Sequence, residues 1–205
     1  SWSIIDYYKE LKPAYYFVKR AFGDIKVNIE ERDGKLYIFG VNDTLRPIEG
    51  KIEAIFSTFK GQGKGRKEVE VEIPANSSIV LTSIPMGDVN KFEEFFYVIL
   101  YDRKGFIVDR NEHFFAPFKH LNLPKAEILY SLEELDKEIF MLHLESDFLA
   151  LWTALELDNA EWEDNYFNIY PKSKYNVIFK APYSLKEVKE NIEVNGFNLK
   201  RARKL

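Results

Sequence analysis

Two groups of carboxylates are the first residues in this sequence whose spacing could support catalysis. Glu93 and Glu94 are adjacent, and Glu161, Glu163 and Asp164 lie close together. A pair of carboxyl groups can act as general acid and base, or cleave a glycoside, when a pocket shifts the pKa of one of them. Both groups fall in polar, loop-like stretches. We therefore interpret them as solvated loop residues and assign no catalytic residue.

The sequence gives weaker support to a metal site, a phosphate-binding loop or a catalytic nucleophile than to the carboxylate pairs. His113, His120 and His143 match no zinc-ligand spacing, and the chain contains no cysteine. The glycine-rich stretch 61–65 lacks the Lys-Ser/Thr ending of a phosphate-binding loop, so we interpret it as a hairpin loop. A Ser/His/Asp triad stays open, although no G-x-S-x-G motif is present. The sequence predicts no metal site and no cofactor.

Aromatic side chains gather in the last third of the chain, and they are the candidates for binding sugar. Exposed rings on a β-sandwich can stack on sugar rings, and the candidates here are Trp152, Trp162, Tyr166 and Tyr170. The competing interpretation is core and inter-domain packing, because aromatic residues dominate cores and interfaces. We favour packing and keep the sugar site as the alternative.

Composition excludes several classes of protein. The 205 residues carry a net charge of −4, which argues against a nucleic-acid binder, since those are normally basic. No apolar run is long enough to predict a membrane-spanning helix. No signal peptide is recognisable at the start, and the lack of an initial Met suggests an excised piece. The cysteine-free composition favours a bacterial source, and with it a cytoplasmic location.

The elements that position these candidate residues are of two kinds, because the spacing of apolar residues along the chain changes at Gly23. Before it, apolar residues recur at spacings of three or four, which predicts a helical segment over residues 1–22. Ser3 and Asp6 resemble a capping box at its start, and Pro13 predicts a kink or two short helices. Residue 23 onward alternates with period two, which is typical of half-buried strands.

Two β-domains are predicted after the helical segment. Residues 23–118 contain about seven strands, including a hairpin at Arg32-Asp33-Gly34-Lys35, which suits an immunoglobulin-like antiparallel sandwich. Residues 119–125 are predicted to be a linker, and residues 126–205 a second, slightly smaller sandwich. Within it, we predict that 132–139 is a charged hairpin region and that the basic end, 200–204, is a solvated terminus. The predicted fold is mainly β, with two sandwiches in tandem behind an N-terminal helix.

Several stretches resemble one enzyme family. The opening SWSIIDYY, with Lys12, Tyr15-Tyr16 and KRAF at 19–22, is similar to the end of the catalytic barrel of β-mannosidases in glycoside hydrolase family 2. Stretches 36–43 and 111–115 resemble the next sandwich of that family. Stretches 147–157 and 164–171, the latter DNYFNIYP, resemble its C-terminal immunoglobulin-like domain. The SWS-x-x-D start and the D-N-Y-F motif are the most specific of these similarities.

This resemblance implies a parent enzyme that removes terminal β-linked mannose from the non-reducing ends of mannosides. The family retains anomeric configuration with two Glu residues, and both lie upstream of the last barrel strand. The resemblance therefore places no catalytic residue in this chain. The N-terminal helix would be the last helix of that TIM barrel. Trp2 would follow its last strand and approach the catalytic face, unless it only packs at the helix start.

Three functions remain open on the sequence. The chain could be the non-catalytic end of a β-mannosidase, with the catalytic barrel as its partner and the sandwiches bracing it or mediating a homodimer. It could be a carbohydrate-binding module for β-mannoside sugars. It could also be a pair of adhesion domains, because a fold does not fix a function. If the barrel is removed, the helix must cover the first sandwich, pair with another copy or fray.

Overall fold

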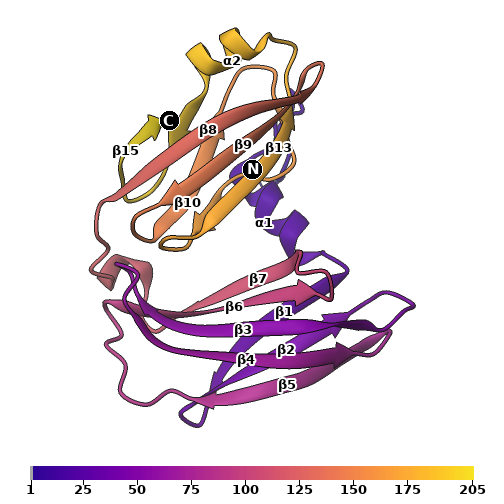
Figure 1. Ribbon diagram of the computed structural model, residues 1–205, viewed down its shortest axis with the longest axis vertical. Coiled ribbons are helices and arrows are strands. Elements are labelled where there is room, and N and C mark those ends of the chain that lie inside the picture. The colour runs from indigo at the N-terminus through magenta and orange to yellow at the C-terminus, as the bar shows by residue number, and fades with distance from the viewer. Residues whose placement is uncertain (1) are drawn as a thin grey trace. The chain divides into compact units, whose positions relative to one another are not determined.

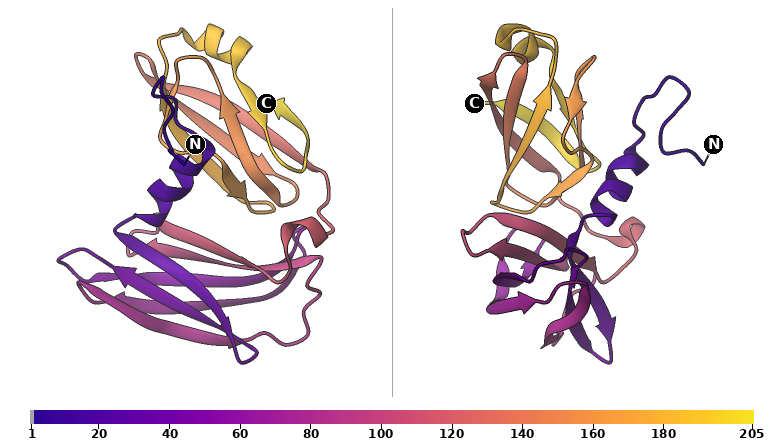
Figure 2. Two further views of the ribbon diagram at one scale, coloured as in Figure 1. Left: turned by 180° about the vertical axis from the view of Figure 1, so that it is seen from behind. Right: turned by 90° about the vertical axis from the view of Figure 1, so that its right-hand side faces the viewer.

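The computed structural model describes residues 2–205, so Ser1 of the SWS motif lies outside the described residues. The chain forms two compact units, and each is described by itself (Figure 1). The first sandwich comprises residues 21–58 and 62–122. The second unit comprises residues up to 20, residues 59–61 and residues 123–205. Figure 2 shows the layered strands within each unit.

The first sandwich consists of seven antiparallel strands in two sheets, as the alternation of its sequence predicts. One sheet has the order β1-β2-β5 and the other β4-β3-β6-β7. A short 3-10 helix, η1 (Phe118–His120), follows the last strand. The strands are β1 (Ile25–Arg32), β2 (Lys35–Asn42), β3 (Ile48–Thr58), β4 (Gly63–Ile73), β5 (Ser77–Pro85), β6 (Glu94–Asp102) and β7 (Ile107–Phe114).

Alternating side chains of these strands build the core between the sheets. Leu36 and Ile38 of β2 and Ile52 of β3 have no exposed surface. Where β1 and β7 approach, the carboxylate of Asp109 accepts hydrogen bonds from the Val27 backbone N–H at 2.8 Å and from Lys26 Nζ at 2.6 Å. Because β1 and β7 belong to different sheets, this carboxylate joins the two sheets along one edge.

The β1–β2 hairpin has the predicted turn. Asp33 and Gly34 both have positive φ, 50° and 70°. Two consecutive left-handed residues are typical of the two-residue hairpin turn that an Asp-Gly pair favours, since glycine adopts this conformation at little cost. The turn fixes the register in which Arg32 lies opposite Lys35.

The second unit contains a second sandwich, again of two sheets. Their orders are β12-β10-β14 and β11-β13-β9-β8-β15. The predicted charged hairpin region is confirmed as the turn joining β8 to β9. The strands are β8 (Ala126–Asp136), β9 (Ile139–Ser146), β10 (Ala150–Glu156), β11 (Glu161–Trp162), β12 (Phe167–Ile169), β13 (Lys174–Lys180), β14 (Glu193–Asn195) and β15 (Leu199–Lys204).

The basic end of the chain is mostly exposed, as predicted for a solvated terminus, but it forms a strand that the sequence did not predict. β15 pairs in parallel with β8. The carboxylate of Glu127 on β8 accepts from Lys200 Nζ at 3.2 Å and pairs with Arg201 at 2.8 Å. The positive charges of this end therefore have a carboxylate partner, and the Arg201 hydrogen bond holds the pKa of Glu127 below its usual value.

The N-terminal helix is shorter than predicted. Helix α1 covers Pro13–Ala21 only, and residues 2–12 form an extended loop closed by an antiparallel bridge between Ile5 and Leu11. The predicted capping box is also wrong, because the Asp6 side chain accepts from the Glu10 backbone N–H at 2.9 Å instead. Pro13 begins the helix, where a residue without an N–H is tolerated.

A second helix, α2 (Leu185–Asn191), was not predicted. Ser184 and Glu187 form a complete capping box at its start, with the Ser184 backbone N–H donating to the Glu187 carboxylate at 2.8 Å. These bonds satisfy two of the backbone N–H groups that a helix start leaves without partners. Val188 is the buried residue of this helix.

Candidate docking site at helix α1

Helix α1 presents two different sides. Tyr16 is only 4% exposed, and Arg20, four residues further along, lies on the same side of the helix. Phe17 is 46% exposed, on another side. The helix is grouped with the second sandwich by its contacts, although more than a hundred residues separate the two in sequence.

Arg20 binds a single loop of the second sandwich, residues 163–166. Its guanidinium pairs with the carboxylate of Asp164 and donates to the backbone carbonyls of Asn165 at 2.9 Å and Tyr166 at 3.1 Å. Lys19 Nζ donates to the carbonyl of Glu163 at 2.6 Å. Two cations at the end of the helix thus satisfy three carbonyls and a carboxylate, and they also complement the negative end of the helix dipole.

Asp164 has partners on both carboxylate oxygens. In addition to Arg20, it accepts from the Tyr175 hydroxyl at 2.8 Å and from the Asn165 backbone N–H at 2.8 Å. Its side chain is only 20% exposed. The interpretation of this carboxylate as a solvated loop residue was therefore wrong: it holds the loop and the helix together.

Asn165, the second residue of the D-N-Y-F motif, fastens the loop to strand β10. Its Oδ1 accepts from the backbone N–H of Leu155 and of Tyr166, and its Nδ2 donates to the Leu155 carbonyl, each at 2.8 Å. The residue is 3% exposed, so these bonds lie in a poorly solvated place. They also hold Tyr166 at a φ of 54°, a conformation that bulky residues rarely adopt.

Two tyrosine rings complete the contact. The rings of Tyr16 and Tyr166 lie 5.9 Å apart between centroids. Burial, with smaller contributions from Tyr166, Tyr15 and Asp164, raises the pKa of Tyr16 to about 12. Burial, followed by the charge of Glu156, also raises the pKa of Tyr166. The phenols are therefore neutral at ordinary pH and act as apolar packing surfaces.

Residues 2–12 present large apolar side chains to solvent. Trp2 is fully exposed, Tyr7 is 92% exposed and Tyr8 is 79% exposed. The segment is nevertheless ordered by hydrogen bonds, since Lys12 Nζ donates to the Ser3 carbonyl at 3.1 Å and to its hydroxyl at 3.2 Å. An ordered segment with exposed rings is typical of a surface that another protein region covers.

The four aromatic candidates for sugar binding have separate surroundings. Trp162 packs on Phe179 at 4.4 Å between ring centroids, and Tyr170 has no exposed surface. Tyr166 contacts helix α1, as described above.

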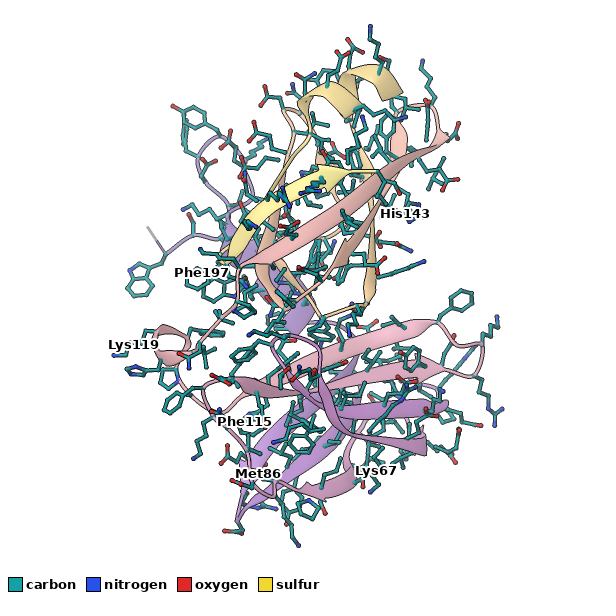
Figure 3. The ribbon with its side chains drawn as sticks, turned by 60° about the vertical axis from the view of Figure 1, so that its left-hand side comes forward. Lys67, Met86, Phe115, Lys119, His143 and Phe197 are labelled. Carbon is teal, nitrogen blue, oxygen red and sulfur yellow. The ribbon has the colours of Figure 1, made fainter. Side chains whose placement is uncertain are left out.

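Trp152 is the fourth aromatic candidate. It is half-buried at a φ of 50° in a bulge of β10, with its backbone N–H donating to Asn168 Oδ1 at 2.9 Å. Phe197, which is labelled in Figure 3, meets it edge-on with 4.9 Å between the ring centroids.

His113 and His143 each lie beside one carboxylate. His113 Nε2 lies 2.9 Å from Glu31, and His143 lies between Asn176 and Glu133. Glu94, which is 6% exposed, pairs with Lys64 at 2.8 Å, so its interpretation as a solvated loop residue was wrong. Among residues 2–205, no group of three or more His, Asp or Glu side chains could hold a metal ion. Over the same residues, no helix has the length and apolar character needed to cross a membrane.

Much of this contact is made by three residues: Lys19, Arg20 and Asn165. In the sequence, these residues stood out only as members of stretches that resemble one enzyme family. Arg20 follows Tyr16 by four positions, which places both on one side of a helix, and this was the available signal. No local pattern in the sequence predicted which loop Arg20 contacts, because 144 positions separate Arg20 from Asp164.

Comparison with known proteins supports the resemblance for both sandwiches. A family model described as a mannosidase Ig/CBM-like domain matches residues 34–120, and one described as an Ig-fold domain matches residues 123–198. β-Mannosidase B of Aspergillus niger is 23% identical over 190 residues, covering 83% of this chain and 22% of its own length.

Solved structures agree with these matches. The β-D-mannosidase of Dictyoglomus thermophilum superposes with a TM-score of 0.94 at 62% identity, over 98% of this chain and 25% of that chain. An exo-chitosanase of Amycolatopsis orientalis has a TM-score of 0.72 at 16% identity, over 97% of this chain and 28% of its own, and so shares the fold. The chain spans about a quarter of the length of these larger relatives. It belongs to the immunoglobulin-like C-terminal region of the β-mannosidases of glycoside hydrolase family 2.

Proposed function

We propose that this chain is the non-catalytic end of a β-mannosidase, in which residues 2–22 join the sandwiches to a catalytic barrel. The observation that supports this most is the two-sided junction. One side of α1 is held on the second sandwich by Arg20 and Tyr16, while Trp2, Tyr7 and Tyr8 are exposed and ordered. A segment whose helix is held by one domain and whose preceding loop exposes large apolar rings fits between two folded regions.

The proposed parent reaction is hydrolysis of terminal, non-reducing β-D-mannose residues with retention of configuration. Such enzymes use two carboxyl groups, a nucleophile and an acid/base, which we place in the barrel and not in this chain. Trp2 is the residue we place nearest to the catalytic face, where barrel enzymes carry their sites. Its complete exposure in this chain supports a partner outside the described residues.

The sandwiches are proposed to brace the barrel. The second sandwich contributes a rigid loop, because Asn165 ties it to β10 and Asp164 ties it to Tyr175. A helix anchored to such a loop loses freedom to swing, so the position of the barrel's last helix would be fixed by groups on a different domain.

Activity measurements on two polypeptides test this proposal. The 205-residue chain and the longer polypeptide encoded by its gene are assayed with an aryl β-mannoside. We expect turnover by the longer polypeptide only, and an upstream sequence that encodes a barrel with two catalytic Glu. Turnover by the chain alone would contradict the proposal, and so would an upstream region without a barrel.

A second candidate function is carbohydrate binding. Its support is the contact between two rings: Trp152, half-buried on β10 with a positive φ, and Phe197, 55% exposed in the turn before β15. The burial of Tyr170 and the packing of Trp162 on Phe179 leave these two rings without a role in it.

Titration with manno-oligosaccharides, followed by tryptophan fluorescence, separates the two candidates. Sugar binding predicts a saturable change that is lost in Phe197→Ala but kept in Phe92→Ala, a control at another exposed phenylalanine. No change up to millimolar sugar would exclude the binding module and leave the bracing role.

A further inference from the structure

One end of the first sandwich brings three connecting segments together. Ile25, at the start of β1, lies opposite Asn42, at the end of β2. On the other sheet, Gly50 near the start of β3 lies opposite Asp102 at the end of β6. The segment before β1, the β2–β3 loop and the β6–β7 turn therefore share this end of the sandwich (Figure 1).

Hydrogen bonds and an ion pair fix these segments. The Asp43 backbone N–H donates to the Asp24 carbonyl at 2.8 Å, which joins the β2–β3 loop to the segment before β1. The guanidinium of Arg103, in the β6–β7 turn, pairs with the carboxylate of Glu49 on β3. These polar contacts hold the loops in defined positions, so the apolar side chains at the loop tips are not needed to fix the loop conformation.

The tips of these segments carry large apolar side chains that face solvent. Phe22 is 83% exposed, Leu45 84%, Phe106 68% and Ile107 44%. We call these four residues the loop-end surface. Arg46 and Lys104, both exposed, lie beside it in the sequence. Apolar residues with a charged surround are the usual composition of a protein interface.

We infer that the loop-end surface docks against the catalytic barrel of the same polypeptide. Phe22 immediately follows helix α1, so the surface adjoins the point where the chain passes from the proposed junction into the first sandwich. The relatives are about four times as long as this chain, so the proposed barrel would be large enough to cover the surface. This inference rests on the proposed function and adds a contact made by the first sandwich itself.

The test uses the longer polypeptide, with Leu45→Ser and Phe106→Ser as variants. The control is Phe92→Ser. Phe92 also lies in a loop and is 49% exposed, but it is at the opposite end of the sandwich. If the barrel covers the surface, the two variants shorten the half-life of mannosidase activity on heating about fivefold or more, and the control does not. In the 205-residue chain, all three should leave the melting temperature unchanged.

Solvent footprinting gives a second readout. Residues 43–47 and 103–107 should be protected in the longer polypeptide relative to the chain, and residues 88–92 should not. Equal protection or equal half-lives in an active enzyme would overturn this inference and leave the proposed function intact. An inactive longer polypeptide without a barrel would overturn both.

Discussion

At the scale of single residues, Arg20 and Asp164 carry the contact between helix α1 and the second sandwich. The guanidinium meets a carboxylate and two carbonyls, and the carboxylate also accepts from Tyr175. Removing one partner would leave the other groups partly buried and without their hydrogen bonds. Such losses cost more than the net value of the bonds themselves.

Arg20→Met should therefore destabilise the second unit, because methionine keeps part of the apolar stem but none of the donors. We expect a loss of about 1–3 kcal/mol in the free energy of unfolding, with faster hydrogen exchange over residues 13–20. Lys186→Met is the control, since Lys186 and Glu190 form an exposed pair at 3.9 Å and should change stability by less than about 0.5 kcal/mol. Equal effects would contradict the assignment.

Tyr16 makes the stability depend on pH in the alkaline range. Its pKa is raised from 10.0 to about 12 in the folded chain, so the unfolded chain loses the proton first. The stabilisation is complete below pH 10 and disappears as the pH rises toward 12, an effect of about 3 kcal/mol. Tyr16→Phe should flatten this part of the denaturation profile. A profile that is the same in both proteins would show that the phenol does not ionise on unfolding.

At the scale of elements, residues 59–61, in the hairpin turn between β3 and β4, belong to the second unit. Phe59 is 1% exposed, and its carbonyl accepts from the Leu149 backbone N–H at 2.8 Å. Gly61 has a φ of 74°, and a Cβ there would lie 2.6 Å from the Cβ of Pro171. The turn therefore requires glycine both for its backbone and for the close approach.

Gly61→Ala should lower the free energy of unfolding by more than the backbone strain of about 1 kcal/mol alone. Gly105→Ala is the matched control, because Gly105 also has positive φ, 85°, but a Cβ there would have nothing within 4 Å. Chemical denaturation of both variants measures the difference. If the two substitutions cost the same, the approach of Pro171 does not constrain the turn.

The elements show where sequence patterns suffice. Strands such as β4 follow from alternation, because one face of each sheet meets the core and the other meets solvent. The helical segment predicted over residues 1–22 was too long, since Ile4, Tyr8 and Leu11 have helical spacing but lie in a loop. Helix α2 was missed although its Ser184–Glu187 capping box was readable, because only one buried residue, Val188, marks its inner side.

The candidate site was less predictable than the strands. The contact between Arg20 and Asp164 joins positions 144 residues apart, and no local pattern encodes such a pairing. The D-N-Y-F motif was found by resemblance to a family, but only the structure shows which contacts its residues make. Asp164 holds the helix, Asn165 fastens the loop, and Phe167 stacks on Tyr175 at 3.9 Å.

At the scale of the whole molecule, the chain contains two sandwiches, each with its own core. It also contains the proposed junction, residues 2–22, whose first part exposes large apolar side chains to solvent. Each sandwich buries its own cluster of apolar residues, so each has the interior expected of an independent domain. The exposed rings of residues 2–12 and the loop-end surface are among the apolar parts that residues 2–205 leave exposed to solvent.

Hydrogen exchange distinguishes the held side of the junction from its open side. It is measured for residues 2–20 in the 205-residue chain and in the longer polypeptide. We predict that residues 13–20 are protected in both, because the second sandwich holds them, and that residues 2–12 become protected only in the longer polypeptide. Rapid exchange of residues 13–20 in the chain, or no gain of protection at residues 2–12, would contradict the proposal that this segment joins the sandwiches to a barrel.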